Sequence, residues 1–205
     1  MNQQDQIYID SVQEQINSGM YLRLLTIGNT PMVFLDIGAN IGLVSSYFAQ
    51  FSKRIVAIEP SPETFGALTD LTRNMPKIEC YQVALAPENA FVPFYVNDIN
   101  FTASSTVNTY GKQIMVEGIT LSTMLQVYKL DHVDVCKCDA EGSEGESLSY
   151  EQLFLAKDII KCWYIETHNC PLTSWEHKLG TIVGNLARCG YSKQTINGMA
   201  ITASK

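Results

Sequence analysis

The chain has 205 residues, of which 46% are hydrophobic, enough for one domain over residues 1–205 with a sizeable core. Its net charge of −7 argues against nucleic acid as a partner, because binding phosphates requires a basic surface. No run of about 18 apolar residues predicts a membrane span, and the N-terminus lacks the pattern of a secretory signal, so we expect a cytoplasmic protein that does not bind membranes.

Residues 1–30 are predicted to form a helical cover. Within residues 5–18, Ile9, Val12 and Ile16 fall on one face of a helix that ends near Gly19. This helix could cover a cofactor or only pad the edge of a sheet, and padding is the simpler expectation.

Residues 32–51 predict a strand, a glycine turn and a helix. An apolar run ends in Asp36, the turn carries Gly38 and Gly42, and apolar residues then recur at helical spacing. Such a turn lets a ligand approach bare backbone at the positive end of a helix. We therefore expect the site of a nucleotide-like cofactor here.

A second strand over residues 55–59 ends in another acid, Glu59. Ser61 is expected to cap the next helix, with Pro62 in its first turn. Residues 78–85 predict a third strand.

Residues 87–119 interrupt the alternation of strands and helices. Residues 91–96 and 114–119 predict antiparallel strands, joined by a polar loop that contains residues 102–106. That loop could be a plain connection or a lid over the substrate, and we favour the lid. Thr120 is expected to cap a short helix.

Two further strands are predicted at residues 132–138 and 161–166. Ser149 with Gln152, and Thr173 with Glu176, have the spacing of capping boxes at the start of two helices. Asn197-Gly198 predicts a closing hairpin between short strands. The pattern as a whole predicts an α/β fold with a mainly parallel sheet and helices on both faces.

The six cysteines are expected to be reduced and mostly buried. They include no Cys-x-x-Cys pair, and no histidine stands at the spacing of a zinc ligand. Cys136 and Cys138 share one face of a predicted strand, which would be an unusual metal pair.

Two acids at strand ends suggest which cofactor binds. A dinucleotide site requires Gly-x-Gly-x-x-Gly, whereas this turn is Gly38-x-x-x-Gly42. Asp36 would repel a pyrophosphate but suits the sulfonium and ammonium groups of S-adenosylmethionine, and Glu59 could hold its ribose hydroxyls. The alternative is that these acids only cap neighbouring helices. This alternative stays open for Glu59, and it explains the two acids together less well.

Several sequence blocks resemble the FkbM-type S-adenosylmethionine-dependent methyltransferase family. The blocks are Phe-Leu-Asp-Ile-Gly-Ala-Asn-Ile-Gly, Ile-Glu-Pro-Ser-Pro-Glu, Gln-Val-Ala-Leu, Ile-Thr-Leu and Val-Cys-Lys-Cys-Asp-Ala-Glu-Gly-Ser-Glu. The resemblance covers roughly residues 33–168 and implies a Rossmann-like class I fold with strand order 3-2-1-4-5-7-6. Ser122 and Gly145-Glu146 depart from the family's pattern.

The resemblance also implies the residues of a cofactor site. These are Asp36, Gly38, Ala39, Asn40, Gly42, Glu59, Ala84, Leu85 and Asp139. Among them, Glu59 would hold the ribose, while Ala84 and Leu85 would lie near the adenine.

The residues expected to carry the chemistry are Lys137, Asp139, Glu141, Glu166 and His168. A lysine inside an apolar strand is costly unless paired, so we expect Lys137 to pair with Asp139 or Glu141. This pair could be purely structural, but the carboxyl end of a strand is where open α/β sheets bind ligands.

A base near the acceptor would assist O-methylation, and His168 could be that base or be only structural. Asp139, Glu141, Glu166 and His168 could also bind a divalent ion together. The sequence does not decide this, and no metal is predicted.

We therefore expect an S-adenosylmethionine-dependent O-methyltransferase that acts on a small-molecule or saccharide-like hydroxyl. The alternatives are a nicotinamide-dependent oxidoreductase, or a module that binds a cofactor without catalysis.

Overall fold

The computed structural model describes residues 3–17, 19, 21–27, 30–96, 104, 106–107, 111–169 and 174–205. Its main sheet has seven strands: β1 (Met32–Ile37), β2 (Ser52–Ile58), β3 (Ile78–Tyr81), β7 (Val133–Cys138), β8 (Ile160–Glu166), β9 (Lys193–Asn197) and β10 (Ala200–Ser204). A smaller sheet has three strands: β4 (Ala84–Leu85), β5 (Ala90–Val96) and β6 (Lys112–Ile119).

The order of the main sheet is β3-β2-β1-β7-β8-β10-β9, which is the order that the family resemblance implies. Strands β3, β2, β1, β7 and β8 are mutually parallel, whereas β10 runs antiparallel to both of its neighbours. The turn between β9 and β10 contains Gly198, whose φ of +58° is left-handed. The predicted closing hairpin is therefore confirmed.

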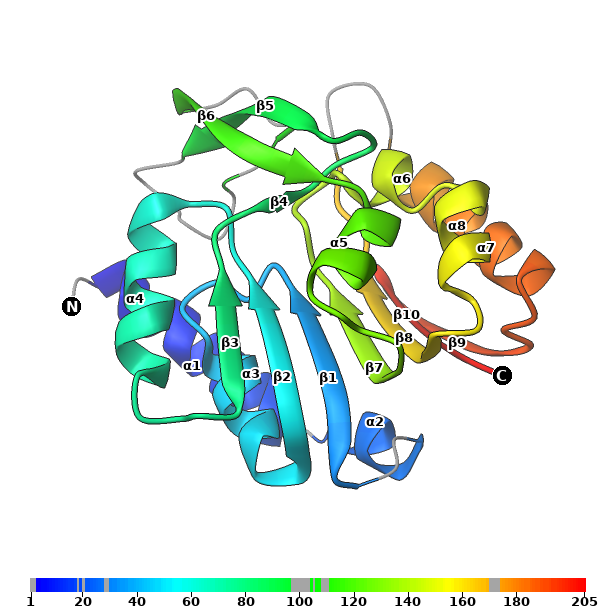
Figure 1. The fold of residues 1–205 in the computed structure, drawn as a ribbon, viewed down its shortest axis with the longest axis horizontal. Coiled ribbons are helices and arrows are strands. Elements are labelled where there is room, and N and C mark those ends of the chain that lie inside the picture. Colours follow the sequence, from blue (N-terminus) through cyan, green and yellow to red (C-terminus); the bar gives the residue numbers. More distant parts are fainter. Residues whose placement is uncertain are drawn as a thin grey trace.

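The single strand predicted over residues 78–85 is wrong. The chain leaves the main sheet after Tyr81, and β4 pairs instead with Gly118 and Ile119 of β6. Strands β5 and β6 form the predicted antiparallel pair. In Figure 1 this smaller sheet lies beyond the arrowheads of β1, β2 and β3, at the carboxyl end of the parallel strands.

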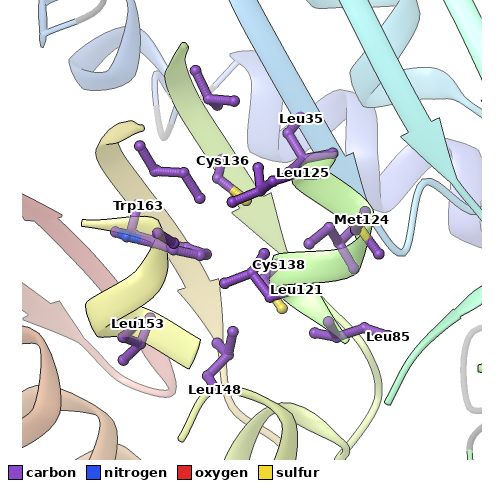
Figure 2. Packing of buried hydrophobic residues seen from close by; sticks show 14 of the residues in the cluster. Leu35, Leu85, Leu121, Met124, Leu125, Cys136, Cys138, Leu148, Leu153 and Trp163 are labelled. Atoms are coloured by element: carbon purple, nitrogen blue, oxygen red, sulfur yellow. The ribbon is translucent and has the colours of Figure 1, made fainter. Parts of the chain in front are cut away.

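Helices cover both faces of the main sheet. They are α1 (Gln3–Asn17), α2 (Leu22–Ile27), α3 (Leu43–Phe48), α4 (Pro62–Thr72), α5 (Leu121–Val127), α6 (Glu144–Ser147), α7 (Tyr150–Ala156) and α8 (Trp175–Arg188), with a 3-10 turn η1 (Ala49–Phe51) after α3. Because side chains alternate along a strand, neighbouring residues of β1 enter different cores. Phe34 packs with Phe48 of α3 and Tyr21, and Leu35 packs with Leu121 and Leu125 of α5 (Figure 2).

The helix starts follow the predicted caps except at one helix. Ser61, Thr120 and Ser149 accept hydrogen bonds from backbone amides three residues on, at 3.5, 3.2 and 3.3 Å. Gln152 does not complete the expected capping box, since its side chain accepts from the amide of Ser122. Helix α8 is capped by Ser174, whereas Thr173 lies outside the described residues.

The cysteines of the described residues are free thiols, as expected, while Cys170 lies outside that part of the chain. Cys136 and Cys138 are buried in the core beside α5 (Figure 2), and burial raises the pKa of both thiols. No helix among the described residues is both long and apolar enough to cross a membrane.

Candidate functional site

The glycine turn after β1 is fixed by contacts from two neighbouring strands. The amides of Gly38 and Ala39 donate to the carbonyl of Ile58 at 3.0 and 2.9 Å, and the amide of Asp139 donates to that of Ile37 at 3.0 Å. Gly38 has a φ of +75°, and a Cβ atom there would lie 1.7 Å from the carbonyl oxygen of Asp139. Gly38 is therefore required by the close approach of the chain that leaves β7.

Gly42 has a different role. Its φ is +90°, and a Cβ atom there would lie 2.6 Å from the Leu68 side chain of α4. This glycine allows α4 to pack against the start of α3 and does not line the pocket described next.

One pocket at the carboxyl end of the sheet joins most of the predicted cofactor residues. Those in its wall are Gly38, Asn40, Glu59, Ala84, Leu85 and Asp139. The predicted residues Asp36 and Ala39 are buried and lie outside that wall. Ser104 and Thr106, from the loop predicted to be a lid, also line the pocket.

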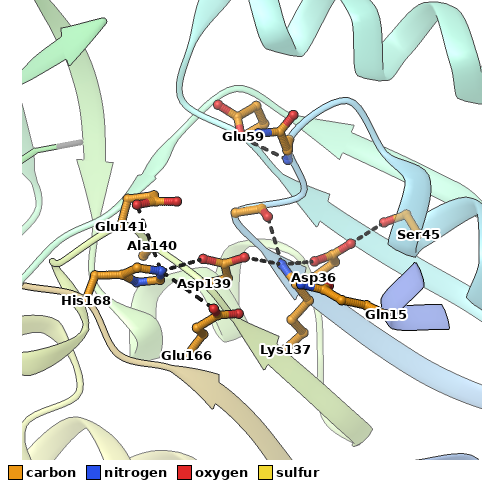
Figure 3. A network of polar contacts seen from close by, with 12 residues as sticks. Gln15, Asp36, Ser45, Glu59, Lys137, Asp139, Ala140, Glu141, Glu166 and His168 are labelled. Carbon is orange, nitrogen blue, oxygen red and sulfur yellow. Dashed lines mark hydrogen bonds and ion pairs between the residues drawn. The ribbon is translucent and has the colours of Figure 1, made fainter. Parts of the chain in front are cut away.

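Glu59 connects the end of β2 to the glycine turn. Its two carboxylate oxygens accept hydrogen bonds from the amides of Ser61 at 2.9 Å and Asn40 at 3.0 Å. Figure 3 shows the position of Glu59 relative to the other charged residues. Burial raises the pKa of Glu59 to about 7, against the effect of these two amides. Both amides precede the first turns of α3 and α4, and α4 is capped by Ser61, so Glu59 does not cap either helix. The same carboxylate also faces the pocket.

Lys137 lies at the centre of a buried ionic network. It is the strand neighbour of Asp36 on β1, and its Nζ atom lies 3.3 Å from Asp36 Oδ1 and 3.4 Å from Asp139 Oδ2. Lys137 also donates to the carbonyl of Gly38 at 2.9 Å. The expected pairing with Asp139 is present, and Asp36 is a second partner that the sequence did not predict.

The remainder of this network involves Asp36 and α1. Asp36 is fully buried; burial raises its pKa, and the charge of Lys137 and a 2.7 Å hydrogen bond from Ser45 oppose that rise. Gln15 of α1 points toward the same group (Figure 3). Helix α1 therefore contributes a side chain beside this buried network.

His168 follows β8 and is surrounded by carboxylates (Figure 3). Its Nδ1 atom lies 3.1 Å from Glu144 Oε1. Its Nε2 atom lies 3.7, 3.9 and 4.0 Å from oxygens of Asp139, Glu141 and Glu166. Burial lowers the pKa of the ring, but the hydrogen bond to Glu144 and the other carboxylates outweigh it and raise that pKa to about 9. An unperturbed histidine is mostly neutral near pH 7, whereas His168 here keeps its proton and is not favoured as a base.

Two carboxyl groups beside His168 have raised pKa values. Burial, together with neighbouring acids, raises the pKa of Glu141 to about 8, and the pKa of Glu166 is raised for the same reasons. A base is most effective when its pKa lies near the working pH. A pKa of about 8 leaves Glu141 mostly protonated at pH 7, as His168 is, so only its minor ionised fraction could accept a proton.

Two residues that position the site were absent from the predicted set. Glu144 is fully buried and accepts hydrogen bonds from the amides of Ala140 and Gly142, at 3.0 Å each, as well as contacting His168. Lys178 of α8 donates to the carbonyls of Gly142 at 2.5 Å and His168 at 2.8 Å. These contacts hold the loops after β7 and β8 together.

The pocket combines acidic groups with an apolar wall. Its acids are Glu59, Asp139 and Glu141, and its apolar side chains include Ile37, Ile58, Val83, Leu85 and Phe94. A ligand with an apolar ring system and a positive centre, such as S-adenosylmethionine, fits this donor set. A pyrophosphate would meet carboxylates.

Several solved structures have a similar fold. A precorrin-6y C5,15-methyltransferase from Geobacter metallireducens is 16% identical, with a TM-score of 0.53 over 91% of this chain and 87% of that one. A precorrin-8w decarboxylase from Methanobacterium thermoautotrophicum is 14% identical, with a TM-score of 0.52 over 92% of this chain and 89% of that one. A METTL16 methyltransferase domain is 13% identical, with a TM-score of 0.51 over 94% of this chain and 83% of that one. At these identities the likeness establishes the fold, a Rossmann-like class I methyltransferase fold.

The family is established by a different comparison. No curated protein matches the sequence. The family model of the methyltransferase FkbM domain, however, matches residues 36–193, which contain the glycine turn, the pocket and the charged loops after β7 and β8. The chain therefore belongs to the FkbM methyltransferase domain family and is an S-adenosylmethionine-dependent methyltransferase.

Proposed function

We propose that the enzyme methylates a hydroxyl oxygen of a small-molecule or saccharide-like acceptor. When bound, S-adenosylmethionine supplies a methyl group already activated on a sulfonium, so the protein must mainly position the acceptor and manage its proton. The observation that carries the proposal is the position of two carboxyl groups with raised pKa values: Glu141 lies in the pocket wall, and Glu166 Oε1 lies 4.0 Å from His168 Nε2 beside it. The ionised form of either group can accept the proton of a hydroxyl.

The cofactor residues have separate tasks in this proposal. Glu59 accepts hydrogen bonds from the ribose hydroxyls, and Ala84 and Leu85 contact the adenine. Asp139 faces the positive end of the cofactor and orients it toward the acceptor. Lys137 keeps Asp139 in place from below, as their 3.4 Å ion pair supports.

We further propose that residues 87–119 form a lid over the acceptor, which the positions of Ser104 and Thr106 in the pocket wall support. The net charge of −7 supports an acceptor other than nucleic acid. Free thiols in the described part of the chain are consistent with a cytoplasmic location.

A transfer assay tests the proposal. The enzyme is incubated with S-adenosylmethionine tritiated in its methyl group and with a panel of saccharides and hydroxylated small molecules, matched amines, and RNA. Label on an acceptor oxygen supports the proposal, and label only on nitrogen, carbon or RNA overturns it. Binding of S-adenosylhomocysteine without transfer to any acceptor would favour the non-catalytic module.

Glu59 makes cofactor binding depend on pH. Since the ribose hydroxyls donate to an ionised carboxylate, binding should lower the pKa of Glu59 from about 7, and affinity should rise as the pH passes through that value. We expect S-adenosylhomocysteine to bind roughly tenfold more weakly at pH 6 than at pH 8, because one pKa unit corresponds to a factor of about ten. Isothermal titration calorimetry at pH 6, 7 and 8 measures this.

Two variants identify the titrating group. Glu59→Gln should bind more weakly at pH 8 and lose the dependence, whereas Glu63→Gln, which removes an exposed acid at the start of α4, should keep it. A Glu59→Gln variant with the wild-type pH profile would refute the ribose role.

A further inference from the structure

We propose that Asp139, Glu141 and His168 bind one divalent cation beside the cofactor pocket. One ligand atom from each of these residues can be chosen so that all lie within 4.8 Å of one another. Ligands of a common ion, each about 2.0–2.6 Å from it, can be separated by at most ~5 Å, so this spacing fits a shared ion. Asp139 and Glu141 also line the pocket, which places the cation next to the cofactor.

Three atoms that face one another at the centre of the cluster support a ligand there. His168 Nε2 lies 3.7 Å from Asp139 Oδ1 and 3.9 Å from Glu141 Oε2, beyond the usual range of about 2.7–3.2 Å for a hydrogen bond. Asp139 Oδ1 is buried, and it has no hydrogen-bond partner among the described residues. A buried carboxylate oxygen of this kind is costly unless a cation or a donor satisfies it. Without a metal, the protonated ring of His168 faces this oxygen at 3.7 Å, and a bound cation would displace the Nε2 proton.

Partners around the cluster hold its ligands in orientation. Glu144, itself fully buried, contacts Nδ1 of His168 at 3.1 Å and so turns Nε2 toward the carboxylates. Lys137 pairs with the other oxygen of Asp139 at 3.4 Å. A carboxylate that holds the second nitrogen of a histidine is the usual arrangement around a metal-bound imidazole.

The donor set indicates the class of ion. Imidazole nitrogen favours first-row transition metals, and carboxylate oxygens favour Mg²⁺ and Mn²⁺, so one nitrogen with two carboxylates suits Mn²⁺. Glu166, with Oε1 at 4.0 Å from His168 Nε2, lies beside the site. A cation bound there would draw an acceptor hydroxyl oxygen toward the pocket and lower the pKa of that hydroxyl. The O–H proton would pass to the Glu166 carboxylate, the oxygen would bond to the methyl carbon, and the carbon–sulfur bond of the sulfonium would break to release S-adenosylhomocysteine. This catalytic role of the cation deepens the proposed function and rests on it. Binding of the cation to the site does not depend on the proposed function.

The test measures cation binding without any acceptor. The full chain is treated with EDTA, dialysed and titrated with Mn²⁺, and free Mn²⁺ is followed by electron paramagnetic resonance. We expect one saturable site per chain, at least tenfold weaker in Asp139→Asn and in His168→Gln. Glu146→Gln removes an exposed acid of α6 outside the cluster and should bind as the wild type does. Circular dichroism and the midpoint of urea denaturation, both measured in EDTA, show that each variant is folded.

Each outcome decides the proposal. Saturable binding that both ligand variants weaken and the control keeps supports it. No saturable binding up to millimolar Mn²⁺, or equal binding by wild type and either ligand variant, overturns it. Failure of the proposed function is seen separately, as the absence of methyl transfer to hydroxyls in the tritium assay with Mn²⁺ present.

Discussion

Replacing Lys137 by methionine should lower the free energy of unfolding by about 3–5 kcal/mol at neutral pH, the range for removing one partner of a buried ion pair. Methionine keeps most of the length of the lysine side chain but removes the ammonium group. Asp36, with none of its surface exposed, then loses the ion pair at 3.3 Å, and its hydrogen bond from Ser45 alone cannot compensate a buried charge. Urea denaturation followed by circular dichroism measures the loss.

Two further variants separate the buried charge from a general effect of losing a lysine. Lys157 pairs with the mostly exposed Asp158 at 3.5 Å, so Lys157→Met should cost at most about 1 kcal/mol. The double variant Asp36→Asn with Lys137→Met removes both charges, and we expect it to recover most of the lost stability. If Lys137→Met costs no more than the Lys157 control, Asp36 is already neutral in the folded protein.

The main features of the fold could be predicted from the sequence because each has a local signal. Hydrophobic periodicity located the strands and longer helices, and Asn197-Gly198 located the hairpin. The strand order came from the family resemblance, since periodicity alone does not say which strands are neighbours. Where sheet membership depends on distant partners, prediction failed: the chain between Tyr81 and Ala84 changes sheets to reach β6.

Short elements were also missed. Helices α2 and α6 have six and four residues, which is too few for a periodic pattern to be recognised. The N-cap of α8 is Ser174, one residue after the predicted cap Thr173. Serine and threonine are both good caps, so the local sequence does not choose between the two.

In the site, too, residues with a local sequence signal could be predicted, and contacts between distant segments could not. Acids at strand ends could be found from the sequence, but the pairing of Asp36 with Lys137 depends on β1 and β7 being neighbours in register. Lys178 carried a signal that periodicity could have revealed. It lies on the buried stripe of α8 with Ile182 and Leu186, at spacings of four residues, and a lysine in such a stripe requires a polar partner.

Replacing Gly38 by alanine should lower the free energy of unfolding by about 4 kcal/mol or more, among the largest losses for a single substitution. A φ of +75° alone costs a residue with a Cβ atom about 1–2 kcal/mol. The larger effect is steric, because the new atom would lie 1.7 Å from the carbonyl oxygen of Asp139 and would force the ends of β1 and β7 apart. That movement breaks the hydrogen bond of the Asp139 amide to Ile37.

Gly66 offers a matched control within the same protein. It is an exposed glycine of α4 without a positive φ, and a Cβ atom there would meet nothing within 4 Å, so Gly66→Ala should be neutral or stabilise by about 0.5–1 kcal/mol. Denaturation in urea, with and without S-adenosylhomocysteine, measures both variants. Gly38 and Asp139 lie side by side in the pocket wall, so moving them apart changes the shape of the pocket. Gly38→Ala should therefore also lose most of the stabilisation by ligand, while Gly66→Ala keeps it. Equal stability of the two variants would mean that the loop after β7 yields to the added methyl group, and that this glycine is required neither for packing nor for the cofactor.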